Sequence, residues 1–183
     1  MRLRSSVEGY GAVSQMMHWI TVVLVILAWL LGQFDDVFSK GAARAAGLFV
    51  HISAGLAVIG ILVFRLFWRF ADPPPPIEHT ILGAWLDRAG RLAHYLLYAL
   101  LVAVPISGIV LQFARGDALP LFGLTEIASP WVRDRALARS VKEIHEVTAN
   151  ALIVLAALHA AAALLHHWVL RDRTLVRMLP RRS

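Results

Sequence analysis

The chain has 183 residues and a formal net charge of +6. Hydrophobic residues make up 58% of it, and it has no cysteine. Soluble domains are usually about 45–50% apolar, so this excess indicates a membrane protein. The lack of cysteine excludes disulfides, cysteine-ligated iron–sulfur clusters and thioether-linked haem. The charge alone would suit nucleic-acid binding, but basic residues beside membrane helices explain it better in a chain with four long apolar stretches. The first stretch is too long for a signal peptide, and no signal peptide is expected.

The apolar stretches predict four membrane-spanning helices, at about residues 13–34, 45–70, 92–113 and 141–170. The expected fold is an all-α, four-helix membrane bundle that forms one domain over residues 1–183. Four prolines, Pro73 to Pro76, should stop the second helix and form a stiff, extended linker. Pro105 predicts a kink in the third helix. Residues 133–142 are expected to form a separate short amphipathic helix before the fourth span, anchored by Trp131.

The distribution of positive charge predicts the orientation of the helices. Lysine and arginine are more numerous in the N-terminal segment, the loop between the second and third helices and the C-terminal tail than in the other two loops. Cytoplasmic loops carry such an excess. Both termini are therefore expected to face the cytoplasm.

His145 and His159 lie fourteen residues apart in the last apolar stretch. At 100° per residue they point within about 40° of each other, about 21 Å apart along the helix. That separation is most of a bilayer core of about 30 Å. Ionisable groups at membrane depth are costly and usually functional. The spacing predicts two haem sites, each completed by a histidine from another helix, although two unrelated histidines on one helix would give the same pattern.

The expected orientation gives each histidine a depth. His51 begins an inward-going helix, so it should lie in the outer half of the membrane with His145. His18 begins an outward-going helix and should meet His159 in the inner half. His94 begins another outward-going helix at a depth similar to that of His18. Spacing alone does not separate these two candidates for the inner site.

Three further histidines have weaker readings. His79 lies in the linker and is most simply a solvated side chain. His166 and His167 should lie at the inner interface, where an amphipathic belt is one interpretation. The other is a quinone site, because quinone carbonyl oxygens accept hydrogen bonds from imidazole or arginine.

Several short motifs are shared with a known family. They are His18-Trp19, His51-Ile-Ser-Ala-Gly55, Pro105-Ile-Ser-Gly108, Phe122-Gly-Leu-Thr125, and a run from His145-Glu146 through Ala149-Asn150 to His159, His166-His167, Asp172-Arg-Thr-Leu175 and Arg177-Met-Leu-Pro180. With these motifs nearly the whole chain resembles the bacterial cytochrome b561 family, small four-helix cytochromes of the inner membrane. Its tail is similar to the superoxide oxidase branch, superoxide:ubiquinone oxidoreductases.

The resemblance implies two b haems with axial ligands at His18, His51, His145 and His159, which favours His18 over His94. It also implies a ubiquinone site near the inner end of the fourth helix, with His166 and Arg171 as candidates. The loop between the second and third helices departs from that branch, because it is prolyl and acidic instead of lysine-rich. This departure leaves open which basic residues help to hold the quinone.

The expected function is oxidation of superoxide on the periplasmic side, with electrons passed through two haems to ubiquinone. No general base is required. Local positive charge raises the encounter rate of an anion. Four basic residues are candidates for this steering, with lipid head-group contact as the alternative: Arg133, Arg135, Arg139 and Lys142.

Two other classes of protein fit parts of the pattern. A cytochrome b subunit that relays electrons between quinone and a dehydrogenase or hydrogenase-type partner would have the same haems and a tight protein partner. A histidine-lined metal or proton transporter without haem would need carboxylates beside the histidines at membrane depth. Glu143 and Glu146 are the only acids close to them in sequence.

Overall fold

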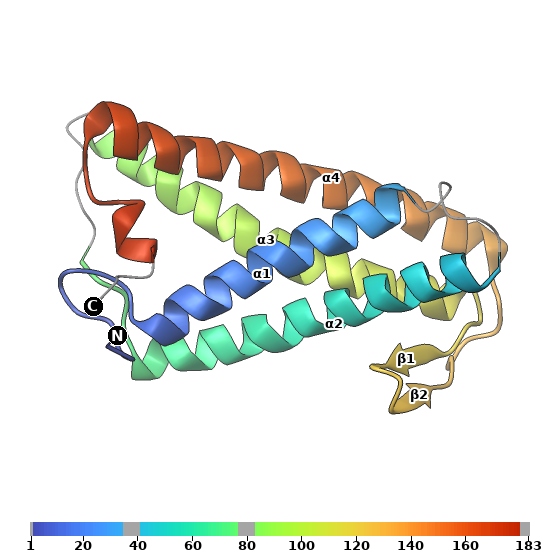
Figure 1. Cartoon of the computed structure of the whole chain (residues 1–183). Coiled ribbons are helices and arrows are strands. Elements are labelled where there is room, and N and C mark those ends of the chain that lie inside the picture. Colours follow the sequence, from blue (N-terminus) through green and yellow to red (C-terminus); the bar gives the residue numbers. More distant parts are fainter. Residues whose placement is uncertain (1, 35–40, 77–82, 180–183) are drawn as a thin grey trace.

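The computed structural model describes residues 2–34, 41–76 and 83–179, which form four long helices and a small hairpin (Figure 1). The helices are α1 (Ala12–Gln33), α2 (Ala42–Ala71), α3 (Ala84–Ala114) and α4 (Arg135–Leu165). Strands β1 (Leu119–Leu121) and β2 (Thr125–Ile127) pair antiparallel. The π-helix η2 (His166–Leu170) continues α4, and the 3-10 turn η3 (Val176–Met178) follows.

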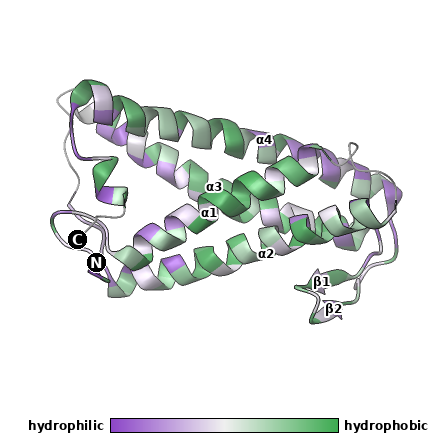
Figure 2. Ribbon diagram, in the orientation of Figure 1, coloured by the Kyte–Doolittle hydropathy of each residue, from purple (hydrophilic) through white to green (hydrophobic). Residues whose placement is uncertain are grey.

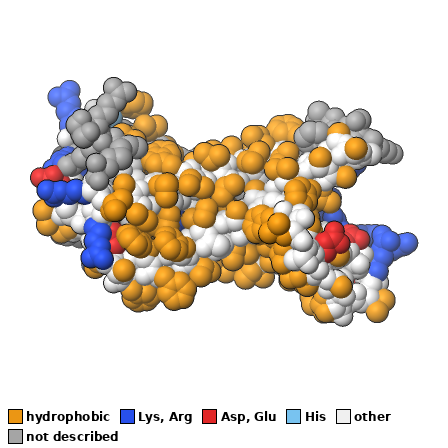
Figure 3. Space-filling model, turned by 60° about the horizontal axis from the view of Figure 1, so that its bottom comes forward, with side chains coloured by type: hydrophobic (Ala, Val, Ile, Leu, Met, Phe, Trp, Pro, Cys, Tyr) orange, Lys and Arg blue, Asp and Glu red, His pale blue; other side chains and the backbone are white. Residues whose placement is uncertain are grey.

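All four helices are long and apolar enough to cross a membrane, with mean hydropathy between 1.8 and 2.3 over their most apolar windows. Large apolar side chains point outward along them; Phe67 is 70% exposed and Phe70 is 87% exposed. Hydrophobic side chains cover the middle of the molecule, and charged side chains gather at its two ends (Figures 2 and 3). This is the pattern of a bundle that faces lipid, and it confirms the predicted all-α membrane fold.

The long helices form two antiparallel pairs, because α1 packs mainly on α2 and α3 mainly on α4. Both chain termini lie at one end of the bundle, and the β-hairpin lies at the other (Figure 1). We refer to these as the terminal end and the hairpin end. Between the pairs, the Trp29 indole N–H donates to the Asn150 side-chain oxygen over 2.9 Å. No large side chain of the described residues is completely buried, so the interior is loosely filled.

Two helices begin earlier than predicted. α3 begins at Ala84, because nothing between it and residue 92 breaks a helix except Gly90, which a helix tolerates. α4 begins at Arg135, so the predicted separate amphipathic helix is wrong. The carboxylate of Asp134 accepts the backbone N–H groups of Ala136 and Leu137 at 2.9 and 3.0 Å. This N-cap starts one continuous helix, and no glycine or proline interrupts it.

The prolines act in two ways. α2 ends at Ala71, directly before Asp72 and the four prolines, as predicted. Residues 73–76 have no regular secondary structure. Pro105 lies inside α3, which stays one helix through it, and the kink remains a prediction.

Polar contacts tie the terminal end together. The Ser5 hydroxyl and backbone N–H both donate to the Asp72 carboxylate, at 2.7 and 2.9 Å. The Arg177 guanidinium donates to the backbone oxygens of Pro76 and Val7, at 2.9 and 3.2 Å. The tail after α4 is therefore anchored to both the N-terminal segment and the segment after α2.

The shared motif that begins at Phe122 forms the tip of the hairpin. A three-residue loop joins the paired residues Leu121 and Thr125. Phe122 and Gly123 both have positive φ, 54° and 74°, and the Leu124 N–H donates to the Leu121 backbone oxygen at 3.0 Å, which closes a tight turn. A Cβ atom at Gly123 would lie 3.4 Å from the Phe49 ring on α2. The hairpin thus packs against the beginning of α2.

Candidate functional site

Nearest the hairpin end, the imidazoles of His51 on α2 and His145 on α4 face each other. Their ring centroids lie 6.0 Å apart with the rings 74° from parallel. A metal–imidazole bond is about 2.0 Å long, so two rings that grip one iron have centroids roughly 6 Å apart. The observed separation fits one iron between the two rings.

A hydrogen bond to the other nitrogen orients each ring. The Nδ1 atom of His51 lies 2.8 Å from the Ala28 backbone oxygen on α1. The Nδ1 atom of His145 lies 3.1 Å from the Val104 backbone oxygen and 3.0 Å from the Ser107 hydroxyl on α3. An Nδ1–H that donates to a carbonyl leaves the lone pair on Nε2, which is the form that binds a metal. Both imidazoles are therefore oriented at Nδ1 by backbone carbonyls, with Nε2 left for a metal.

Each of these two imidazoles packs against a carbonyl and a glycine of the facing helix, and we call that arrangement its seat. The two seats are built in the same way. Four residues after each acceptor carbonyl the facing helix carries a glycine, Gly32 on α1 and Gly108 on α3. A Cβ atom at Gly32 would lie 3.2 Å from Cε1 of His51, and one at Gly108 would lie 3.3 Å from Cε1 of His145. Each glycine thus makes room for an imidazole against the backbone. Sequence reasoning missed this role, although Gly108 belongs to a shared motif.

Gly55 on α2 ends the shared motif that begins at His51. A Cβ atom there would meet nothing within 4 Å, and the same holds for Gly60. Both positions therefore border open space, in contrast to Gly32 and Gly108. The space beside Gly55, one turn from His51, has room for a bulky group.

Nearer the terminal end, three histidines come together. The ring centroids of His94 and His159 lie 5.0 Å apart, and the imidazole of His18 interacts electrostatically with both. His18 and His159 are half-buried, whereas His94 is exposed. The structure therefore brings both sequence candidates, His18 and His94, close to His159.

A cationic side chain lies beside this cluster. The charge of Arg65 on α2 acts on both His18 and His94. Its guanidinium lies 5.7 Å from the ring centroid of Tyr98, and its Nη2 atom lies 3.5 Å from the Tyr98 hydroxyl. Arg65 and Tyr98 line a small cavity of about 50 Å³ between α1, α2 and α3. Positive charge here matches the propionate carboxylates of a haem b.

His166 and Asp172 form a hydrogen-bonded pair after α4. The Nδ1 atom of His166 lies within hydrogen-bonding distance of Oδ2 of Asp172, and Oδ1 accepts the Thr174 backbone N–H at 2.9 Å. Burial acts to raise the pKa of Asp172, but the hydrogen bonds from His166 and Thr174 outweigh it and hold that pKa below 3.8. Arg171, the other quinone candidate, is exposed with φ of 56°. Sequence reasoning did not single out Asp172.

The four basic candidates for superoxide steering lie at the hairpin end, around the start of α4. Arg133, Arg135 and Arg139 are exposed. Lys142 forms an exposed ion pair with Glu146 at 3.2 Å, which offsets its charge. The three arginines therefore provide most of the local positive charge among these candidates.

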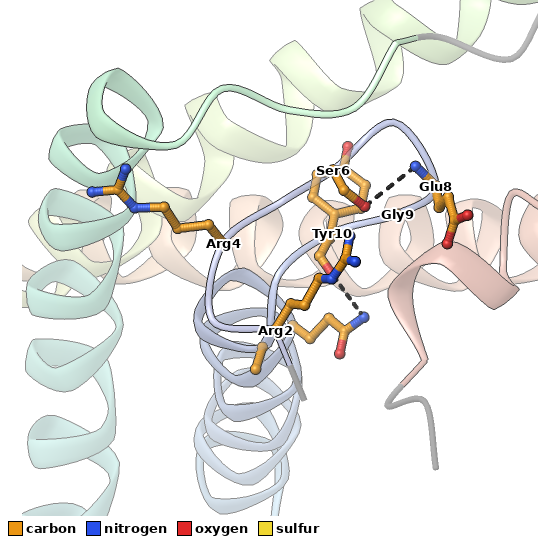
Figure 4. A pocket seen from close by; sticks show the side chains of 8 residues that line it. Arg2, Arg4, Ser6, Glu8, Gly9 and Tyr10 are labelled. Carbon is orange, nitrogen blue, oxygen red and sulfur yellow. Dashed lines mark hydrogen bonds between the residues drawn. The ribbon is translucent and has the colours of Figure 1, made fainter. Parts of the chain in front are cut away.

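Two further histidines were candidates in the sequence. His79 lies outside the described residues. His167 lies next to Trp168, with ring centroids 6.4 Å apart. A cavity of about 260 Å³ lies at the terminal end, lined by Arg2, Arg4 and their neighbours on the N-terminal segment (Figure 4). Among the described residues no histidine lines that cavity, which separates it from the histidine sites.

Comparisons with known proteins agree on one family. The family model described as prokaryotic cytochrome b561 matches residues 9–181. The chain is 32% identical over 177 residues to a protein of Yersinia pestis named probable superoxide oxidase CybB, covering 94% of this chain and 97% of that protein. It is 34% identical over 174 residues to cytochrome b561 homolog 1 of Escherichia coli (strain K12), covering 91% and 94%.

A third relative is cytochrome b561 homolog 2 of the same strain, 31% identical over 192 residues and covering 100% of this chain and 97% of that protein. The relatives thus match along almost their whole length, and the family model spans all four helices. The chain belongs to the prokaryotic cytochrome b561 family, haem b proteins that transfer electrons in the bacterial inner membrane.

Proposed function

We propose that this protein oxidises superoxide at the hairpin end and passes the electrons through two b haems to ubiquinone at the terminal end. In this proposal the hairpin end faces the periplasm and both termini face the cytoplasm. The observation that carries it is the opposed pair His51 and His145, with each Nδ1 held by a carbonyl and the ring spacing of one iron. A relative over nearly the whole chain bears the name of a probable superoxide oxidase, which supports the substrate.

Each haem is held by one histidine from each helix pair. His51 and His145 ligate the haem nearer the periplasm, and His18 and His159 ligate the other. The 5.0 Å between the ring centroids of His94 and His159 is shorter than the roughly 6 Å that one iron requires, which supports His18 as the partner. His94 then lies beside the site without ligating iron.

The protein contributes ligands, charge and position to the reaction. Bound haem supplies reversible one-electron transfer. α4 contributes one ligand to each site, about 21 Å apart along its axis, so this single helix sets the distance between the sites. Arg65, whose guanidinium lies over the Tyr98 ring, would offset the propionate charge of a haem held by His18. Nδ1 contacts orient His51 and His145.

Residues at the two ends serve the two substrates. Arg133, Arg135 and Arg139 are exposed at the periplasmic end and attract the superoxide anion, with Lys142 adding less because of its ion pair. His166 and Arg171 lie where α4 ends, at the depth of a quinone head group. His166 donates a hydrogen bond to a quinone carbonyl in this proposal.

Haem counting in single variants tests the ligand assignment. The purified protein should show a b-type Soret band and close to two haems per chain. His145→Ala should lose one haem and stop superoxide-driven reduction of ubiquinone, and His18→Ala should lose the other. His94→Ala is the matched control and should keep both. Two haems retained in the His145 variant, or one lost from the His94 variant, would contradict the assignment.

A relay subunit that serves a soluble oxidoreductase is the second candidate. Leu124 is 88% exposed and Val132 is 92% exposed at the hairpin end, as expected of a surface that a partner or the membrane interface covers. This candidate predicts a tightly bound redox partner and no superoxide activity in the isolated protein. The third interpretation of the sequence, a transporter without haem, is dropped because the chain belongs to a cytochrome b family.

A further inference from the structure

We infer that Asp172 is a positioning residue that orients His166, and that His166 delivers a proton to ubiquinone when the quinone is reduced. The inference deepens the proposed function and rests on it for the identity of the quinone. Its basis is the hydrogen bond between His166 and Asp172 and the backbone arrangement that brings the two residues together.

An ordinary helix would keep these residues apart. Six residues at 100° each leave the two side chains about 120° apart around the helix and about 9 Å apart along it. Here the chain leaves α4 through the π-helix η2, and Arg171 adopts a left-handed conformation with φ of 56°. The Asp172 N–H then donates to the His166 backbone oxygen over 3.1 Å, so the carboxylate folds back beneath the imidazole. π-helical turns often mark functional positions.

Both oxygens of the carboxylate have fixed partners. Oδ2 contacts Nδ1 of His166, and Oδ1 accepts the Thr174 backbone N–H at 2.9 Å. The Thr174 hydroxyl lies 3.5 Å from the same Nδ1 atom. Since Nδ1 is engaged by the carboxylate, Nε2 is the nitrogen that can reach a quinone. The side chains of His166 and Asp172 are 18% and 25% exposed, so each is shielded and still reachable by water.

The chemistry balances with the substrates already proposed. Two superoxide anions each lose one electron and become dioxygen, and ubiquinone gains two electrons and two protons to become quinol. The quinol O–H bond at the carbonyl that faces His166 forms as the N–H bond at Nε2 breaks, and the opposite oxygen takes its proton from the cytoplasmic water. The Asp172 carboxylate stabilises the imidazolium before transfer, and His166 regains a proton from the cytoplasmic water.

The electrostatic surroundings support this arrangement. Because the pKa of Asp172 is held below 3.8 by its hydrogen bonds, the carboxylate is ionised near neutral pH and favours a protonated partner. The Arg173 guanidinium reaches the Glu8 backbone oxygen at 3.4 Å. The start of α3 lies at the same end of the bundle as η2 (Figure 1). Other charged or titratable groups near this pair in the fold lie in and after η2, at the start of α3 and on the N-terminal segment. They are His167 and Arg171, then Asp87, Arg88 and Arg91, and Glu8.

Rapid mixing of the reduced holoprotein with a short-chain ubiquinone isolates the proton-coupled step. Haem re-oxidation would be followed by absorbance from about pH 5.5 to about pH 9, on either side of the ordinary histidine pKa. Loss of the general acid itself costs about 10²-fold or more. Asp172→Asn keeps that acid, His166, but no longer orients it, so re-oxidation should slow about tenfold near neutral pH. The pH profile should move to lower pH, because the carboxylate no longer stabilises the imidazolium. Haem content and haem reduction by superoxide should be unchanged.

Three further variants sharpen the test. Asp172→Glu keeps a carboxylate and should recover part of the rate. His166→Ala should be slow, and adding Asp172→Asn to it should slow re-oxidation no further, because the two residues act as a unit. An unchanged rate and pH profile in Asp172→Asn, additive losses in the double variant, or loss of haem from Asp172→Asn would each overturn the inference.

Two sets of measurements separate this inference from the proposed function. If superoxide fails to reduce the haems of the unaltered protein, the proposed function is wrong. In that case proton transfer by His166 and Asp172 can still be tested on dithionite-reduced protein. If superoxide reduces the haems and the Asp172 variants re-oxidise normally, the proposed function stands and the inferred role of Asp172 is wrong.

Discussion

Replacing Gly108 by alanine tests whether the His145 seat holds a haem ligand. The new Cβ atom would lie 3.3 Å from Cε1 of His145 and 3.6 Å from its Nδ1 atom. The first distance is below ordinary contact, so the imidazole must withdraw by a few tenths of an ångström. Its hydrogen bonds to Val104 and Ser107, now 3.1 and 3.0 Å, would lengthen towards the limit of a hydrogen bond.

The size of the effect follows from these contacts. Loss of a partner that orients a metal ligand typically lowers metal affinity about 10–100-fold, which corresponds to about 1.4–2.8 kcal/mol. Alanine in place of glycine stabilises a helix interior by roughly 0.5–1 kcal/mol. Gly108→Ala should therefore leave the bundle folded while one of its two haems is held less tightly.

Haem transfer to apomyoglobin measures the effect directly, and Gly90→Ala on the same helix is the matched control. A Cβ atom at Gly90 would meet nothing within 4 Å, so that variant should release haem like the unaltered protein. One haem should leave Gly108→Ala about 10–100-fold more readily. Equal release from the two variants would refute the reasoning that links the glycine, the carbonyl seat and the ligand.

Three other predictions concern the ends of α4. Asp134→Ala removes the N-cap and should lower the free energy of unfolding by about 0.5–2 kcal/mol, measured by thermal or denaturant unfolding; no change would contradict the cap. Arg133→Ala with Arg135→Ala should slow the superoxide reaction mainly at low salt, and Lys142→Ala should slow it less because a carboxylate already offsets that charge. A salt-independent rate would leave only lipid contact for these arginines. The folded pKa of Asp172 is below its ordinary 3.8, so its stabilisation is complete above that value and lost as the pH falls through the folded pKa; acid unfolding of Asp172→Asn should lack this component.

The sequence alone predicted the membrane class and the four helices, because hydropathy and helical period are local properties of the chain. The proline run marked the end of α2 correctly. The starts of α3 and α4 were placed too late, since polar residues extend both helices beyond their apolar stretches. The direction of each span and the position of each histidine within it also placed His51 and His145 at one depth, and their rings lie 6.0 Å apart.

Tertiary structure decided the surroundings of those histidines. The register between paired helices determines which carbonyl an imidazole meets, so the seats beneath Gly32 and Gly108 are not visible in the sequence. Packing of α3 on α4 likewise brings His94 to His159, which depth alone left open. The pairing of His166 with Asp172 depends on a π-turn and one left-handed residue, a conformation set by the tail's contacts with the rest of the bundle.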